Sequence, residues 1–159
     1  MTNPDSAIKI LSPEQARSLT EQYGVSCVSC IILTYDQQLL LQKRGGQFGH
    51  FNHCISTFGG RIEDQEKPEK ALYRELEEEL GATIATTDVT FIDVYTEAVT
   101  QFTEVIYGYF WYDRHNSITG CYEGEPLYCQ SAQQALQLDH LIDDVPWLIK
   151  RCCEKDLIE

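Results

Sequence analysis

The segment from Pro68 to Leu80 most constrains how this 159-residue chain folds. Leucine recurs at every fourth position within it, at Leu72, Leu76 and Leu80, and this period places an apolar stripe along one side of a helix. Proline suits the first helical position, and Gly81 stands where a left-handed residue commonly ends a helix. The pattern therefore predicts a helix over this segment with one buried face.

Three carboxylates lie on a narrow arc of the same helix, beside the leucine stripe. Glu75, Glu78 and Glu79 are three and four residues apart, and like charges at these spacings cost about 0.2–0.5 kcal/mol per pair. They also fall in the C-terminal half, where the helix dipole disfavours anions. Converging carboxylates are ligands that Mg²⁺ or Mn²⁺ accepts, so a metal site is one interpretation, and a solvated acidic face is the other.

A glycine-containing loop before the helix completes a longer pattern. Gly60 is followed after five residues by Glu66 and, after seven more, by the run Arg74, Glu75, Leu76, Glu77, Glu78, Glu79, Leu80 and Gly81. This spacing resembles the Nudix box, and all its charged and glycine positions are filled. The sequence departs from the usual pattern at Ala82, where a bulkier aliphatic residue is common, and at Phe58, where many members have proline.

The resemblance implies a fold class and a reaction. Nudix hydrolases are α/β proteins of the α/β/α sandwich type, with a mixed β-sheet between helices. They hydrolyse a nucleoside diphosphate linked to another group X, with Mg²⁺ or Mn²⁺ as cofactor. Carried onto this sequence, the resemblance implies a metal site made by Gly59 through its carbonyl group, Glu75, Glu78 and Glu79. It further implies structural roles for Gly60, Glu66, Arg74 and Gly81, with Glu66 and Arg74 bracing the loop and the helix.

The chemistry of the implied reaction narrows the catalytic candidates. Attack on a pyrophosphate requires screened phosphate oxygens, a deprotonated water and a stabilised leaving phosphate. A carboxylate that is not fully engaged with metal can act as the general base, and Glu78 or Glu75 is the candidate. Glu123 and Glu125 are outside the box, where either would complete the metal site or be an exposed loop charge.

Little in the sequence specifies the substrate. Arg44 and Arg61 are candidates for phosphate contacts, as is Lys43, although each would equally suit a solvated surface. Tyr95 and Phe102 flank a segment without the proline or tyrosine that marks particular substrates in the family. Either ring would stack on a base or pack in the core. We therefore expect a small nucleotide, such as a nucleoside triphosphate or a nucleotide sugar, with base, sugar and X left open.

Two other functions remain compatible with the box. One is a Nudix-fold nucleotide-binding or regulatory protein without turnover, although such a protein is expected to lose box acids that are present here. The other is a pyrophosphohydrolase acting on RNA 5′ ends. The formal charge of −13 disfavours nucleic-acid binding, because no broad positive surface is available to neutralise phosphates.

The cysteines and the apolar runs give expectations about location. No run approaches the roughly 18 apolar residues of a membrane-spanning helix. The seven cysteines form an odd set without disulfide-framework spacing, which favours a reducing cytoplasm. Cys27 and Cys30 resemble half of a zinc site with His50, His53 and Cys54, but residues three apart in a strand point to opposite faces.

We expect an N-terminal arm and helix over 1–24, packed on a hydrolase domain over 25–159. The arm, 1–11, is polar, and Ser12 and Gln15 predict the cap of a helix that ends near Tyr23. Further strands are expected at 25–34 and 38–42 as a hairpin, and at 54–58, 91–96, 104–113 and 126–130, with helices at 131–138 and 145–155. The aromatic strand 104–113 would lie in the core or in a homodimer interface.

Overall fold

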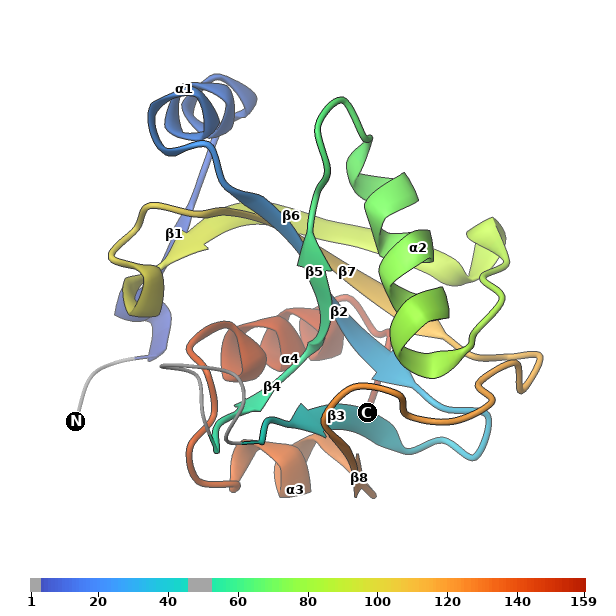
Figure 1. Ribbon diagram of the computed structural model, residues 1–159. Helices are drawn as coiled ribbons and strands as arrows, with labels where there is room; N and C mark the ends of the chain where they lie inside the picture. The colour runs from blue at the N-terminus through green and yellow to red at the C-terminus, as the bar shows by residue number, and fades with distance from the viewer. Residues whose placement is uncertain (1–3, 46–52) are drawn as a thin grey trace.

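A computed structural model describes residues 4–45 and 53–159 and contains one mixed β-sheet (Figure 1). The strand order is β1-β6-β7-β2-β3-β4, with β5 also paired to β2 and β8 to β3. The strands are β1 Ile8–Ile10, β2 Ser26–Leu33, β3 Leu39–Lys43, β4 Ile55–Ser56, β5 Phe58–Arg61, β6 Val89–Glu97, β7 Val105–Tyr112 and β8 Glu125–Cys129. Strands β2 and β7 are parallel, and the other paired strands are antiparallel.

Helices cover both faces of this sheet, so the predicted α/β/α sandwich is confirmed. They are α1 Pro13–Tyr23, α2 Pro68–Leu80, α3 Ala132–Leu136 and α4 Asp144–Glu154. Short 3₁₀ turns occur at Pro4–Ala7, Thr86–Asp88 and Ala98–Thr100. Across the two described stretches, we find no helix with the length and apolar character needed to cross a membrane.

The leucine stripe of α2 forms the core on one face. Leu72, Leu76 and Leu80 are fully buried against the sheet, where they belong to the same cluster as Phe58 and Trp111. The helix ends as predicted, because Gly81 is left-handed (φ 60°) and its N–H donates to the Glu77 carbonyl at 2.9 Å. The buried leucines and the defined end of the helix therefore fix the direction in which the other α2 side chains point.

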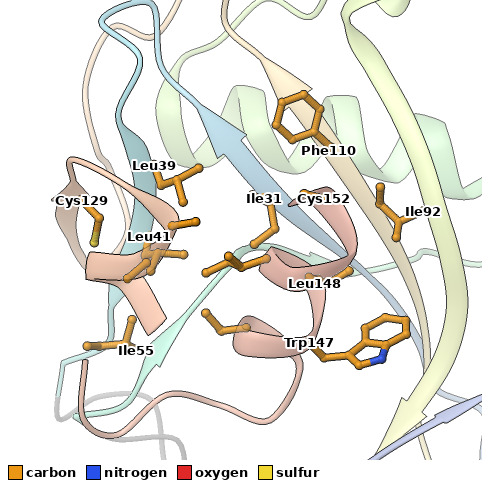
Figure 2. Packing of buried hydrophobic residues seen from close by; sticks show 14 of the residues in the cluster. Ile31, Leu39, Leu41, Ile55, Ile92, Phe110, Cys129, Trp147, Leu148 and Cys152 are labelled. Carbon is orange, nitrogen blue, oxygen red and sulfur yellow. The ribbon is translucent and has the colours of Figure 1, made fainter. Parts of the chain in front are cut away.

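The opposite face is covered by α4 and the short α3. Figure 2 shows α4, with Leu148, beside Ile31 of β2 and Leu41 of β3. The Trp147 ring packs instead against Tyr95 of β6, with ring centroids 4.7 Å apart. These residues form one cluster, in which Leu148 and Ile31 are fully buried. This packing brings the N-terminal end of α4 to the sheet, where Asp144 contacts Ser29 of β2.

The structure differs from the expected strands at two places. The N-terminal arm is not only a polar tail, because Ile8 and Ile10 pair with Glu97 and Tyr95 of β6. Three residues are too few for a clear alternating pattern, so the sequence did not reveal β1. The single strand expected at 54–58 is divided at Thr57 into β4, which pairs with β3, and β5, which pairs with β2.

The division of that strand reflects a fork in the sheet at β2. The first half of β2, Cys27 to Cys30, pairs with β5, whereas Ile32 and Leu33 pair with β3 in the predicted hairpin. Strands β3 and β5 are both neighbours of β2 on the same side, so their backbones must diverge. The diverging backbones leave room between β3, β4 and β5, and the cavity described below opens there.

The aromatic strand β7 lies inside the sheet, between β6 and β2. Tyr109, Phe110 and Trp111 are buried, at 5%, 4% and 1% exposure. These rings are therefore core residues. The expected homodimer stays a prediction.

Candidate active site

A cavity of about 390 Å³ lies where α2 and β5 meet the fork in the sheet. Box residues, two arginines and a second group of acids line it together. The lining includes Gly59, Gly60, Glu75, Glu79, Arg44, Arg61, Glu123, Glu97, Glu104 and Asp144. The fold thus brings four of the box residues, two of the three predicted phosphate contacts and one of the two loop acids to one place, whereas Lys43 is not among the lining residues.

Glu79 forms the buried floor of this cavity. Its residue exposure is only 3%, and one carboxylate oxygen accepts the Gly59 N–H at 3.2 Å. Burial, together with hydrogen bonding and charge from the neighbouring Glu123, raises the pKa of the Glu79 carboxyl group to about 10. A buried acid beside a second acid is costly without a cation, which is a condition that a divalent metal would relieve.

Glu75 lies against the glycine pair of β5. A β-carbon built on Gly60 would lie 2.5–2.6 Å from the carboxylate atoms of Glu75, so the carboxylate occupies the space that the missing side chain leaves. Oε1 of Glu75 accepts from Nη1 of Arg74 at 2.8 Å. Burial raises the pKa of Glu75 despite this guanidinium.

Arg74 ties α2 to the loop before it. Its Nε and Nη2 donate to the two carboxylate oxygens of Glu66, each at 2.9 Å, and Nη2 also donates to the Arg61 carbonyl oxygen at 2.9 Å. Glu66 in turn accepts the Glu63 N–H at 3.0 Å. The hydrogen bonds from Arg74 lower the pKa of Glu66 to about 2. This fork-to-fork pair is the geometry in which arginine binds carboxylate best.

Glu78 and Glu125 lie apart from the cavity lining. The Glu78 side chain is 59% exposed, with Oε1 3.5 Å from Nη1 of Arg74, and Glu125 begins β8 opposite Lys43. In the portion of the chain that is described, no three His, Cys, Asp or Glu side chains are grouped to hold a metal ion. Arg74 explains part of this absence of a metal-binding group, because its guanidinium already binds the Glu75 carboxylate.

The residues nevertheless fit a hard divalent cation by their chemistry. Glu75, Glu79 and Glu123 supply carboxylate oxygens to one cavity, and such oxygens are preferred ligands of Mg²⁺ and Mn²⁺. Glu123 adds to the cost of the buried Glu79 carboxyl group through hydrogen bonding and charge, and a cation bound between the two would remove that cost. The zinc interpretation is not supported by geometry, since Cys27 packs with the α4-side cluster and Cys30 with the α2-side cluster. His50 lies outside the described residues.

A second pair of buried acids was missed in the sequence. Asp144, the first residue of α4, accepts hydrogen bonds at Oδ2 from Ser29 Oγ at 2.9 Å and from the Tyr95 hydroxyl at 2.8 Å. The Asp144 N–H donates to Oε2 of Glu97 at 3.1 Å. Only the packing of α4 against the sheet brings Asp144 to Glu97 on β6. Tyr95 is fully buried, so it is a core residue.

Substitution of Gly60 by alanine should lower activity while preserving the fold. The new methyl group would displace the flexible Glu75 carboxylate, and the backbone needs no left-handed conformation at this position. We expect kcat to fall about tenfold or more, as for misplacement of a catalytic group, with a melting temperature within a few degrees of wild type. Steady-state kinetics and thermal melts measure both. If Gly60→Ala were as active as wild type, the close approach of Glu75 to Gly60 would not be needed for activity.

The Glu97 carboxyl group should make stability fall as pH rises. Burial, together with the charges on Asp144, Asp143 and Glu104, raises its pKa from 4.5 to about 10. The folded state therefore keeps this proton up to a higher pH than the unfolded chain does, and its contribution is lost between about 4.5 and 10. Urea denaturation at pH 6 and pH 9 should show a smaller loss for Glu97→Gln. An unchanged loss would contradict the assignment.

Comparisons with known proteins agree with this geometry. The family model for the NUDIX domain matches residues 25–146. A MutT protein from Methanosarcina mazei Go1 superposes with a TM-score of 0.66 at 18% identity, covering 83% of this chain and 94% of that one. The E. coli ORF135 protein gives 0.60 at 25% identity, covering 83% and 90%.

A longer protein contains a similar fold. The bifunctional NMN adenylyltransferase/ADP ribose pyrophosphatase from Francisella tularensis gives a TM-score of 0.63 at 14% identity, covering 89% of this chain and 46% of that one. A comparison with curated protein sequences finds no match. Because the family model spans well over half of the sequence and includes the whole acidic cavity floor, the chain belongs to the Nudix family of hydrolases.

Proposed function

We propose that the chain hydrolyses a pyrophosphate bond in a nucleoside diphosphate linked to X, with Mg²⁺ or Mn²⁺, on a small substrate such as a nucleoside triphosphate or a nucleotide sugar. One observation carries the proposal: three acids, Glu75, Glu79 and Glu123, and two arginines line a single cavity. Carboxylates that bind metal beside cations that bind phosphate are the requirements of this reaction.

The position of each side chain in the cavity indicates its role. Glu79 would hold the cation at the buried floor, with Glu75 beside it and the exposed Glu123 at the outer side of the cavity, and the Gly59 carbonyl is the fourth candidate. When bound, the cation would screen phosphate oxygens and lower the pKa of a water molecule. Arg44 and Arg61 would neutralise the phosphate oxygens from the cavity wall.

Glu75 is our candidate for the general base. It lines the cavity, where a proton from the attacking water can reach it, and its contact with Arg74 keeps the carboxylate oriented. Glu78 is retained as the second candidate and as a metal ligand, because its carboxylate contacts the same Arg74 guanidinium. Comparison of Glu75→Gln with Glu78→Gln decides between them.

The test is product release from a substrate panel with Mg²⁺, with Mn²⁺ and with chelator. The panel contains nucleoside triphosphates, nucleotide sugars, ADP-ribose, dinucleoside polyphosphates and coenzyme A. We expect metal-dependent turnover of one class, lost in Glu75→Gln and kept in Glu77→Gln, whose exposed carboxylate lies on the same helix outside the cavity lining. Nucleotide binding without turnover of any compound would favour the noncatalytic alternative.

The setting that we propose is the cytoplasm. All seven cysteines are free thiols, which suits a reducing compartment. A long RNA 5′ end is the less favoured substrate, because the net charge of −13 opposes it. Turnover of a 5′-triphosphorylated RNA faster than of free nucleotides would reverse this order.

A further inference from the structure

A second pocket, of about 420 Å³, lies between the first half of α2 and the strands β6 and β7. Its lining consists of four aromatic rings, three smaller residues and one acid, namely Tyr73, Phe91, Tyr107, Tyr109, Pro68, Thr86, Val89 and Glu69. We call it the aromatic pocket. It shares no lining residue with the catalytic cavity, because Glu69 and Tyr73 point to a different side of α2 from Glu75 and Glu79.

The rings of this pocket come from three different elements. Tyr107 and Tyr109 are two residues apart on β7, so their side chains point to the same face of the sheet. Phe91 of β6 is paired with Tyr109, and their ring centroids are 5.5 Å apart with the planes at 68°. Two rings at this angle form a corner. Tyr73 of α2 packs over the same face, so it adds a third side.

Three of the four rings are open to a ligand. Phe91 is 50% exposed, and Tyr73 and Tyr107 are only partly buried, although all three are large side chains on a face whose core is otherwise closed. Exposed apolar ring surface is unfavourable in water. A ligand that covers these rings would therefore gain free energy from the contact.

The charge of the aromatic pocket favours a cation. Glu69 is the one charged side chain among the described residues that line it, and it takes part in none of the ion pairs found between described residues. Burial, and after it the negative charge of Glu69, raise the pKa of the Tyr73 and Tyr109 hydroxyl groups, so this carboxylate lies close to both rings. The faces of aromatic rings are themselves negative.

Among cations, a methylated ammonium group suits this lining best. A primary ammonium is strongly hydrated and needs several hydrogen-bond acceptors, whereas a quaternary ammonium has none to satisfy and presents methyl groups to the ring faces. The Tyr73 ring already has a cation near it, since Nζ of Lys70 lies 5.9 Å from the ring centroid, and Lys70 itself is not part of the pocket lining. The pocket volume is in the range of small-molecule sites.

We propose that the aromatic pocket binds a small molecule carrying a quaternary ammonium group, with the rings around the methyl groups and Glu69 as the counter-charge. This site goes beyond the proposed function, because it is separate from the acids and arginines assigned to hydrolysis. Its test therefore needs no turnover, and failure of either proposal leaves the other standing.

The test compares choline with 3,3-dimethyl-1-butanol, in which a carbon atom replaces the charged nitrogen of choline. Isothermal titration calorimetry on the full chain measures the Kd of each compound. The two have nearly the same shape, so a difference in Kd reports the charge. We expect choline to bind about tenfold more tightly or better, the effect of a cation over several ring faces.

Substitutions of exposed residues locate the binding site without disturbing the fold. Phe91→Leu keeps an apolar side chain but removes the ring, and it should weaken choline binding about fivefold or more, whereas Phe91→Tyr should retain it. Glu69→Gln should weaken choline and leave the neutral alcohol unchanged. Glu77→Gln removes one charge from the same helix outside the pocket lining, so it is the matched control and should bind choline as wild type does.

Three results would overturn the proposal. The first is no binding of choline by wild type at millimolar concentrations, and the second is equal affinity for choline and the neutral alcohol. The third is choline binding that Phe91→Leu and Glu69→Gln leave unchanged, since the ligand would then bind elsewhere. Attachment of the chain to phosphatidylcholine vesicles without binding of free choline would also count against a small-molecule site.

Discussion

Glu79→Gln should reduce kcat by about a thousandfold, the scale of losing a metal-organising or proton-transferring carboxylate. Glu79 is the most buried of the cavity-floor acids, and its carboxylate accepts the Gly59 N–H, which a glutamine oxygen can also do. The local structure should therefore remain while the charge is removed. Kinetics at saturating substrate, with Mg²⁺ and Mn²⁺ titrations, measure the loss.

The same substitution should leave stability equal or higher, because the folded metal-free protein must keep the Glu79 carboxyl group protonated far above its ordinary pKa, a cost that a neutral glutamine does not have. A thermal melt in chelator checks this second expectation. Glu77→Gln removes one charge from the exposed side of the same helix and is the control for kcat. A loss of the same size in Glu77→Gln would mean that the charge of the helix, and not the cavity, governs the rate.

Gly59→Ala should destabilise the protein by about 3 kcal/mol or more, the cost of a strained backbone together with overpacking. Gly59 has a φ of 150°, and a β-carbon there would overlap the Val28 carbonyl oxygen. Backbone atoms cannot move aside as a side chain does, so β2 and β5 would have to separate. Urea denaturation measures the change in free energy of unfolding.

Gly24→Ala is the matched control for this prediction. Gly24 also has a positive φ, of 72°, but a β-carbon built on it meets nothing within 4 Å. Its substitution should cost about 1 kcal/mol, from backbone conformation alone. If both alanine variants lost equal stability, the close contact with Val28 would not be the cause.

The central part of the fold was predictable because its signals are local. The stripe of Leu72, Leu76 and Leu80, the Gly81 end and the capping box at Ser12 each lie within one helix, and the structure contains them as expected. The β1 strand and the fork at β2 were not predictable. Both depend on which distant strand supplies a partner, and a pattern of three residues or one interruption at Thr57 does not encode that.

The site shows the same division between local and distant information. The α2 acids could be identified from their spacing, yet only the structure separates Glu75 and Glu79, which line the cavity, from Glu78, which is exposed. Glu123 and Glu125 are two residues apart, and strand pairing of Glu125 leaves Glu123 in the cavity. Glu97 and Asp144 are 47 residues apart in sequence, and no local pattern joins them.

Because β1 pairs with β6, the part of the chain that folds as one unit is longer than the part that matches the family model. The family match begins at residue 25, but Ile8 from outside it pairs with Glu97 at the end of β6. Substitutions in those first residues can thus alter the neighbour of Glu97 while every box residue stays the same. Relatives with identical boxes can therefore differ in the cavity wall through a segment that the family model leaves out.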